Sequence, residues 1–178
     1  MNPRFLALVL ALAPASAAAL TLTSPDVRPG ARLDDVHALS RNGCPGENLS
    51  PALSWTGAPR ATQSFAVTLF DLDAGNGRGF WHWVLVDIPL LDQDLPRGAG
   101  APGANPAGST VAANDFGAPG YGGPCPPLGD LPHHYRFTVY ALDVRHLELD
   151  AKQTAAQAAA LIDSHTLAEA SLTATWGR

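Results

Sequence analysis

The sequence predicts a single, mainly β domain, and three observations support this. Apolar residues make up 46% of the 178-residue chain and charged residues only 15%, which is enough apolar material for a sizeable core. The 17 glycines and 16 prolines disfavour a helical bundle and are typical of a β fold with many loops. Several short segments rich in β-branched and aromatic residues are bounded by turn residues, as strands are.

Six strands are expected along the chain. The clearest three are residues 64–71, 82–88 and 135–142, with the sequences SFAVTLFD, HWVLVDI and YRFTVYAL. Shorter strands are expected at residues 20–23, 52–55 and 171–176. Stretches rich in Gly and Pro at 74–79, 96–108 and 117–132 predict the turns and loops between them.

One helix is expected near the C-terminus. Thr154 and Gln157 have the spacing of a capping box, and an alanine-rich run follows as far as Asp163. This helix is expected to cover the sheet rather than to bind a partner. Because no repeat or linker interrupts the pattern, residues 20–178 are expected to form one domain.

Residues 1–19 have the pattern of a secretory signal peptide. Arg4 gives a short basic start, an apolar run follows, and small residues place cleavage after Ala17 or Ala19. A membrane anchor is the alternative, but the apolar run is far shorter than the ~20 residues that span a bilayer. The remaining chain contains no second candidate for a transmembrane segment. The expected location is therefore periplasmic or secreted.

The charge of the chain argues against two classes of partner. Its 11 basic and 16 acidic residues give a net charge of −5, and the basic residues form no run. Nucleic acids and anionic membranes attract clusters of Lys and Arg. We therefore expect neither of them as a partner.

The two cysteines lie in segments rich in Gly and Pro. Cys44 and Cys125 are the only cysteines of a chain that carries an export pattern, and an even pair in an oxidising compartment usually forms a disulfide. We therefore expect a Cys44–Cys125 bridge. Two buried free thiols are the alternative.

Polar side chains stand at the ends of the three clearest strands. Because side chains alternate between the faces of a strand, Asp71 shares the face of residues 65, 67 and 69. By the same rule His82 shares the face of residues 84, 86 and 88, while His133 and Tyr135 share that of residues 137, 139 and 141. If these faces share one core, the polar ends meet at its rim as a small pocket. The alternative is that each polar residue marks where its strand reaches solvent.

Six motifs then occur in a characteristic order. They are NLSPALSW (48–55), DLDA (71–74), HW (82–83), NDFG (114–117), GYGGPCPP (120–127) and PHHY (132–135). As a set, they resemble the phosphatidylethanolamine-binding protein (PEBP) family, in the bacterial branch named Raf-kinase-inhibitor-like, over residues 42–178. The resemblance implies an antiparallel β-sandwich-like fold with a few peripheral helices. It also implies a small anion-binding pocket near the surface.

The resemblance also implies which residues bind the ligand. They are the two acids of the family's Asp-Pro-Asp-Ala motif, the pocket histidine, the Gly-Pro loop and the His-Arg-Tyr motif, here Asp71, Asp73, His82, Gly123, Pro124, His133 and Tyr135.

Two residues depart from the family pattern, and one neighbour is added to the expected pocket. Leu72 replaces a proline, which makes the backbone less rigid, and His134 replaces an arginine, which removes a permanent positive charge. Trp81, beside His82, is expected to line the pocket as well.

The leading hypothesis is an exported, non-catalytic protein that binds a small anionic or zwitterionic ligand, such as a phosphate head group. His82 and His133 can donate hydrogen bonds to phosphate oxygens, and they do so better when protonated. A glycine-rich loop lets backbone N–H groups approach an anion closely. Asp71, which repels phosphate, then orients and charges a histidine or meets an ammonium group of the ligand.

Two other classes stay open. Members of the PEBP family also inhibit proteases or kinases, so the chain could bind a protein target, which for an exported protein is a protease or a host protein. The second alternative is a metal-dependent enzyme, with a His-His-Asp set of ligands drawn from His82, His133, His134 and Asp71. The sequence contains neither a Gly-x-Ser-x-Gly nor a His-Glu-x-x-His motif. We therefore expect no catalysis, cofactor or bound metal, in a monomer or homodimer.

Overall fold

The computed structural model describes residues 19–149 and 153–178, so the predicted signal peptide lies outside the described residues except for Ala19. The elements in chain order are β1 (Thr21–Thr23), the 3-10 turn η1 (Asp35–His37), β2 (Leu53–Thr56), β3 (Ser64–Asp71), α1 (Ala74–Gly77), β4 (Phe80–Pro89), β5 (Asp94–Leu95), β6 (Thr110–Val111), β7 (His133–Leu142), α2 (Ala155–His165) and β8 (Thr166–Trp176). Neither helix in this part of the chain is long and apolar enough to cross a bilayer.

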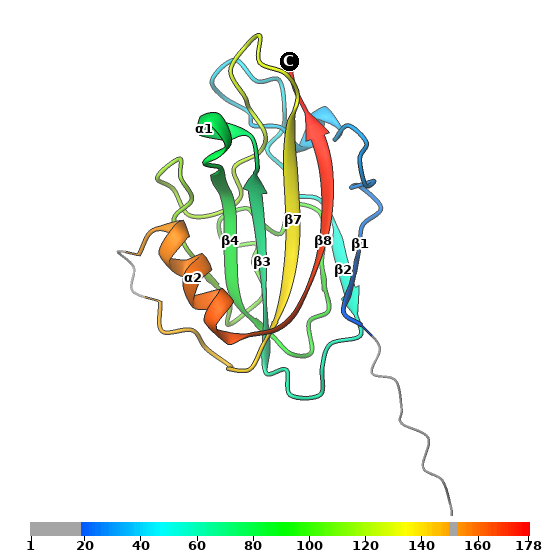
Figure 1. The fold of residues 1–178 in the computed structure, drawn as a ribbon, viewed down its shortest axis with the longest axis vertical. Coiled ribbons are helices and arrows are strands. Elements are labelled where there is room, and N and C mark those ends of the chain that lie inside the picture. The colour runs from blue at the N-terminus through cyan, green and yellow to red at the C-terminus, as the bar shows by residue number, and fades with distance from the viewer. Residues whose placement is uncertain (1–18, 150–152) are drawn as a thin grey trace, which may run out of the picture.

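The strands form two antiparallel sheets, which confirms the predicted mainly β fold. The larger sheet has the order β6-β4-β3-β7-β8, and the smaller one has the order β1-β2-β5. Long strands of the larger sheet run side by side (Figure 1), and β1, which pairs with β2, lies next to β8. Every pairing between these strands is antiparallel.

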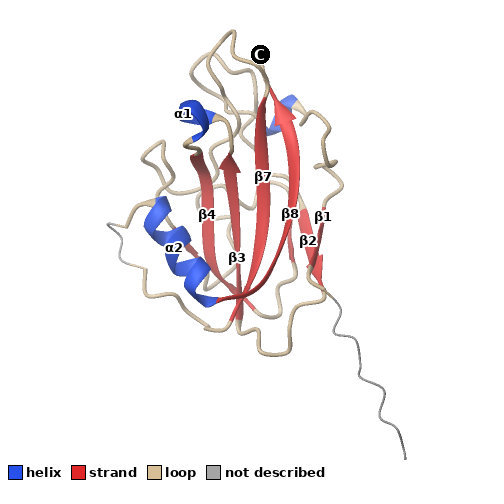
Figure 2. Ribbon diagram, in the orientation of Figure 1, coloured by secondary structure: helices blue, strands red, loops and turns tan. Residues whose placement is uncertain are grey.

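Apolar side chains fill two layers, one on each face of the larger sheet. The main core lies between the two sheets and includes Trp55 of β2, Phe65 of β3 and Phe137 of β7. On the opposite face, Ala158 and Ile162 of α2 belong to a second buried cluster. Figure 2 shows α2 lying against the sheet beside β4. The larger sheet is therefore covered on both faces.

Most predicted elements are present with slightly different bounds. β3 matches the prediction, whereas β4 and β7 each begin two residues earlier than predicted, at Phe80 and His133. β8 begins at Thr166 rather than at residue 171 because the chain passes directly from α2 into the strand. The capping box is present, since the Thr154 hydroxyl accepts from the Gln157 N–H and the Gln157 amide oxygen accepts from the Thr154 N–H.

A bulge in β4 overturns one expectation about His82. On β3, Leu69 pairs with Trp83 and the next residue, Phe70, pairs with Trp81, so His82 has no partner in the register. Such a bulge places successive residues of a strand on the same face. The His82 ring accordingly packs against Tyr135, whose ring belongs to the main core, with 5.3 Å between ring centroids.

The predicted face of His82 was therefore wrong in part. Val84 and Val86 belong to the second cluster, under α2, and do not share a face with His82. A second irregularity follows at Asp87, whose φ of 58° is in the left-handed region, and it returns Ile88 to the main core. Strict alternation fails twice within this one strand.

A disulfide joins Cys44 to Cys125, the pairing that the sequence predicts, across a Cα–Cα distance of 5.9 Å. It ties the segment after η1 to the long loop between β6 and β7. Neither loop contains a long strand or helix of its own, so the bridge supplies an external constraint.

Thiol titration of the denatured, unreduced mature protein should therefore detect no free thiol. Because the bridge spans 81 residues, replacing both cysteines by serine should lower the free energy of unfolding by about 2–4 kcal/mol. Chemical denaturation of the two proteins measures that difference. Two titratable thiols in the wild type, or equal stability of the two proteins, would contradict the bridge.

Candidate ligand-binding site

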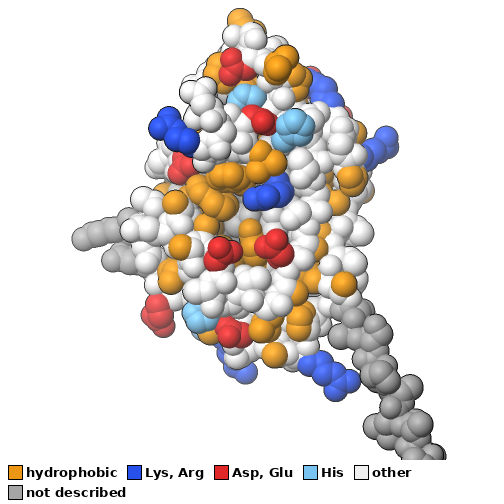
Figure 3. Space-filling view, in the orientation of Figure 1, with side chains coloured by type: hydrophobic (Ala, Val, Ile, Leu, Met, Phe, Trp, Pro, Cys, Tyr) orange, Lys and Arg blue, Asp and Glu red, His pale blue; other side chains and the backbone are white. Residues whose placement is uncertain are grey.

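A pocket of about 320 Å³ opens where β3 ends and β4 and β7 begin. Its lining combines carboxylates and histidines with aromatic and proline side chains, namely Asp71, Asp73, Ala74, Gly75, Asn76, Phe80, His82, Phe116, Cys125, Pro126, Pro127, Asp130 and His133. Figure 3 shows histidine and acidic side chains gathered at the end of the molecule where α1 lies. Larger hollows occur elsewhere. In one of them the two arginines Arg97 and Arg32 form ion pairs with carboxylates, so their charges are already compensated.

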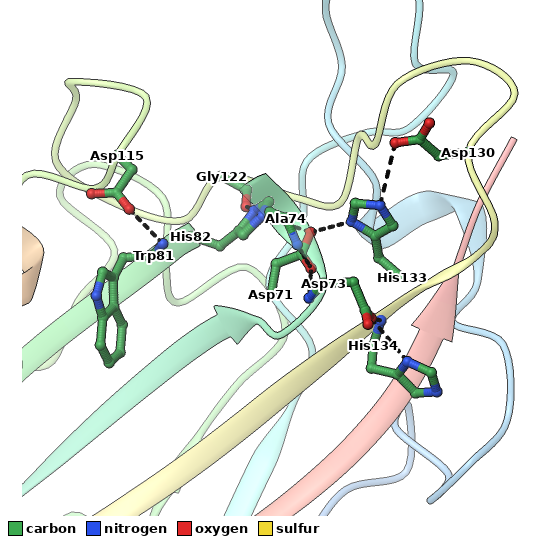
Figure 4. A network of polar contacts seen from close by, with 10 residues as sticks. All are labelled: Asp71, Asp73, Ala74, Trp81, His82, Asp115, Gly122, Asp130, His133 and His134. Atoms are coloured by element: carbon green, nitrogen blue, oxygen red, sulfur yellow. Dashed lines mark hydrogen bonds and ion pairs between the residues drawn. The ribbon is translucent and has the colours of Figure 1, made fainter. Parts of the chain in front are cut away.

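Asp71 lies at the centre of the polar network. One carboxylate oxygen, Oδ1, accepts the N–H groups of Asp73 at 2.9 Å and Ala74 at 3.1 Å. The other, Oδ2, accepts from Nδ1 of His133 at 2.7 Å. Figure 4 shows Asp71 between His82 and His133, at the end of its strand. These contacts compensate for the burial of the charge and fix the orientation of the carboxylate.

His82 is held by the backbone of the neighbouring loop. Its Nδ1 lies 2.6 Å from the carbonyl oxygen of Gly122, and since a carbonyl only accepts, Nδ1 carries the proton. The remaining nitrogen, Nε2, lies 3.9 Å from Oδ2 of Asp71. His82 lines the pocket, so Nε2 is the ring atom available to a ligand. It can donate only when the ring is a charged imidazolium.

Burial lowers the pKa of His82 below its ordinary value of 6.5. Desolvation penalises the imidazolium most strongly, while the Gly122 carbonyl and the Asp71 carboxylate act in the opposite direction. The ring is therefore neutral at neutral pH in the empty pocket. An anion placed at Nε2 would favour the charged form.

Tyr135 lies beneath the histidines. The ring is fully buried, 5.3 Å from His82 and stacked 6.4 Å from His133, measured between centroids. Among the described residues its hydroxyl finds no hydrogen-bond partner. Burial, and after it the nearby Asp71 carboxylate, raises the pKa of Tyr135, so the hydroxyl stays protonated. Tyr135 therefore supports the pocket without being part of its lining.

Asp73 and His134 form a more exposed pair at the rim. Asp73 accepts from the His134 backbone N–H at 2.6 Å and from Nδ1 of the ring at 2.9 Å. Partial burial acts to raise the pKa of Asp73, but these hydrogen bonds hold the pKa below its ordinary value. His134 lies outside the pocket lining. Although it departs from the family pattern, its ring contacts Asp73, an acid of the DLDA motif.

The structure leaves two predicted ligand-binding residues, Gly123 and Pro124, outside the pocket lining. Gly123 packs so closely on the η1 segment that an added Cβ would lie 2.2 Å from the carbonyl oxygen of His37. Its N–H donates to the Asn48 side chain at 2.7 Å and is not free for an anion. Pro124, whose carbonyl accepts from Leu39, also lies outside the lining. The backbone of this loop acts on the site through His82, chiefly by the carbonyl of Gly122 and also at Gly123.

Trp81 does not line the pocket, contrary to the prediction. Its ring packs on Phe70 with 4.4 Å between centroids and lies against the second cluster, under α2. Figure 4 shows the Trp81 ring directed away from Asp71 and the histidines. The same bulge that turns His82 inward leaves Trp81 on the other face of the sheet.

Sequence reasoning missed several residues that build the site. Asn114 donates to the carbonyl oxygen of Gly120 at 3.0 Å and accepts from the Phe116 N–H at 3.0 Å, which holds the loop beside β4. Phe116 then packs edge-on against the His82 ring. Asp130 lies 3.6 Å from Nε2 of His133. Asn114 and Phe116 stood within a recognised motif, and Asp130 stands three residues before His133.

The described residues contain no group of three or more His, Cys, Asp and Glu side chains arranged to hold a metal ion. Of the residues considered from the sequence, His82 and His133 both approach Asp71, whereas His134 contacts Asp73 at the rim.

The fold and the pocket define the class of this protein. The family model for phosphatidylethanolamine-binding protein matches residues 23–177, so the chain belongs to the PEBP family. Among relatives, it is 42% identical over 161 residues to the UPF0098 protein YbcL of Escherichia coli (strain K12). The aligned residues cover 89% of this chain and 88% of that protein. It is also 36% identical over 167 residues to LppC of Mycobacterium tuberculosis (strain H37Rv), named as a lipoprotein, covering 93% of this chain and 77% of that protein.

Solved structures agree with this assignment. The crystal structure of E. coli YbcL, described as a new member of the mammalian PEBP family, superposes with a TM-score of 0.86 at 40% identity, covering 90% of this chain and 99% of that one. CT736 of Chlamydia trachomatis, described as a PEBP homologue, gives a TM-score of 0.75 at 29% identity, covering 90% and 99% of the two chains.

The His82 ring should titrate below 6.5, the ordinary value, because burial disfavours its charged form. NMR titration of the ring C–H signals measures this pKa. The unfolded chain takes up the proton first, so the free energy of unfolding should fall as pH decreases from about 6.5 through the folded-state pKa. His82→Phe should make that decrease less steep. A His82 ring that titrates above 6.5 would contradict the prediction.

Proposed function

We propose that this protein is an exported, non-catalytic binding protein whose pocket takes a phosphate-bearing small ligand, such as a phospholipid head group. One observation carries the proposal: two buried histidines from different strands converge on one buried carboxylate at a pocket wall. Membership of the PEBP family, whose name refers to a phospholipid, supports the same ligand class.

The histidines would bind the phosphate in different ways. Because Gly122 occupies Nδ1 of His82, this ring offers Nε2–H to a phosphate oxygen only after taking up a proton. Asp71 holds Nδ1–H of His133, so the Nε2 atom of that ring faces away from Asp71. Asp71 thus acts on the ligand mainly by orienting His133 and by favouring the charged form of His82.

Aromatic and proline side chains give the pocket an apolar wall. Phe80 and Phe116 pack edge-on against each other with 4.7 Å between centroids, and Pro126 and Pro127 continue the lining. Such a wall suits the carbon atoms that link a phosphate to the rest of a head group. It also excludes water from the charged contacts, which strengthens them.

Three observations support export. The first residues have a signal-peptide pattern, the structure contains a disulfide, and a relative that covers most of this chain is named as a lipoprotein. Disulfides persist in oxidising compartments such as the periplasm. A periplasmic or secreted location is therefore part of the proposal.

A protein-interaction module is the second candidate, favoured by one feature of the surface. Leu128 and Leu131 are 79% and 84% exposed in the loop that carries Pro126 and Pro127 of the pocket lining. Exposed apolar side chains beside a pocket are frequent at docking surfaces. A pocket variant that still inhibits a protease target would favour this candidate over ligand binding.

Titration calorimetry with glycerophosphoethanolamine tests the ligand hypothesis. Its phosphodiester keeps one negative charge from mildly acidic to mildly alkaline pH, so pH dependence reports on the protein. Binding by the wild type should strengthen as pH falls and should take up a proton. His82→Ala should weaken binding about ten- to a hundredfold, the cost of a hydrogen bond to a charged group, and should flatten the pH dependence.

Two other histidines provide controls. His134→Ala removes a ring at the rim and should have much less effect. His37→Ala removes a buried ring whose Nδ1 also bonds a carbonyl, that of Leu49 at 2.7 Å, but which lies outside the pocket. It should leave affinity nearly unchanged. If His82→Ala binds like the wild type at every pH while His134→Ala does not, the proposed pocket is built on the wrong histidine.

A further inference from the structure

His133 is placed between two carboxylates. Its Nδ1 lies 2.7 Å from Oδ2 of Asp71, and its Nε2 lies 3.6 Å from Oδ2 of Asp130. Figure 4 shows the ring between these two acids, which come from different segments of the chain. A carboxylate is only an acceptor, so the arrangement is favourable when both nitrogens of the ring are protonated. Both ring nitrogens of His133 are therefore directed at acids.

Asp130 differs from Asp71 in how it is held. Asp71 is buried and accepts two backbone N–H groups, whereas the Asp130 side chain is 49% exposed and lies in the loop that follows Pro127. Among the described residues its carboxylate has no contact with a charged group other than His133. Asp130 also lines the pocket. A carboxylate from a loop thus stands beside the ring nitrogen that an anionic ligand needs.

We propose that Asp130 is a tethered competitor, which occupies Nε2 of His133 in the empty pocket and which an anionic ligand displaces. This inference rests on the proposed function and adds a residue that sets its selectivity. An incoming anion can contact Nε2 of His133 only if the Asp130 carboxylate moves away, or if the anion binds despite repulsion from that carboxylate. The pocket therefore discriminates against simple anions that bring no further contacts.

Several charged groups surround the His133 ring. Asp71 faces it from β3, Asp73 lies near the start of α1, His82 reaches the same Asp71 oxygen from β4, and Asp130 approaches from the loop. Tyr135, on β7, is a neutral neighbour. Removing the Asp130 charge frees Nε2 of His133 for an anion and removes a carboxylate that repels the anion.

Titration calorimetry with sulfate, which stays a dianion from mildly acidic to mildly alkaline pH, tests the competition. At mildly acidic pH, Asp130→Asn should bind sulfate about three- to tenfold more tightly than the wild type, because the variant removes the carboxylate that competes for His133 and repels the anion.

Two further variants make the comparison specific. Asp130→Glu keeps the charge and should restore binding close to that of the wild type. Asp143→Asn removes the same charge from an equally exposed partner, 49% in both, of another histidine, His165. Asp143 follows the far end of β7, so this variant should bind sulfate like the wild type.

The outcomes distinguish failure of this inference from failure of the proposed function. If sulfate binding requires His82 but is the same in wild type and Asp130→Asn, Asp130 does not compete and the pocket stands. An equal gain in Asp143→Asn would reduce the effect to net charge and overturn the competition. If neither sulfate nor glycerophosphoethanolamine binds to any of these proteins, the proposed function fails and the role of Asp130 fails with it.

Discussion

The position of β3 in the middle of the larger sheet is the constraint on which the rest of the structure depends. β3 pairs along its whole length with β7 and, through two irregularities, with β4. Seven of its eight residues are buried, because the main core covers one face and α2 the other. Both neighbours are antiparallel, so the end of β3 lies beside the start of each: Asp71 pairs with Phe80 on one side and with Tyr135 on the other. Residues far apart in the chain therefore meet at Asp71.

The carboxylate of Asp71 converts this meeting of strands into a defined polar site. A buried charge is costly unless hydrogen bonds replace its hydration. Here two backbone N–H groups at the α1 turn and one histidine supply them. The turn continues through Gly75 and Asn76, whose φ values of 61° and 59° lie in the left-handed region. Local turn formation, the orientation of His133 and the charge of the pocket thus depend on the same two oxygen atoms.

The loops between β6 and β7 complete the site from outside the sheet. They contain little regular structure, and side chains hold them instead: Asn114 and Asn48 bond their backbone, and the disulfide fixes Cys125. Gly122 directs the tautomer of His82, and Asp130 approaches His133. The sheet therefore positions the residues at the inner side of the pocket, and a loop that is fixed by the disulfide forms its outer side. This division suits a pocket that must hold precise donors and also admit a ligand.

The sequence by itself determined the long strands, the capped helix, the expected cysteine pair and the faces of β3 and β7. These features depend on local patterns, so residue types and spacing suffice: Asp71 and Tyr135 lie on the faces that alternation predicts. Tertiary structure decided the face of His82, because the bulge opposite Leu69 and Phe70 depends on how two strands pair. It also decided that Trp81 turns away and that the Gly123 N–H is used by Asn48, 75 residues distant. Alternation is a property of one strand, whereas a bulge or a long-range hydrogen bond belongs to two segments that only folding brings together.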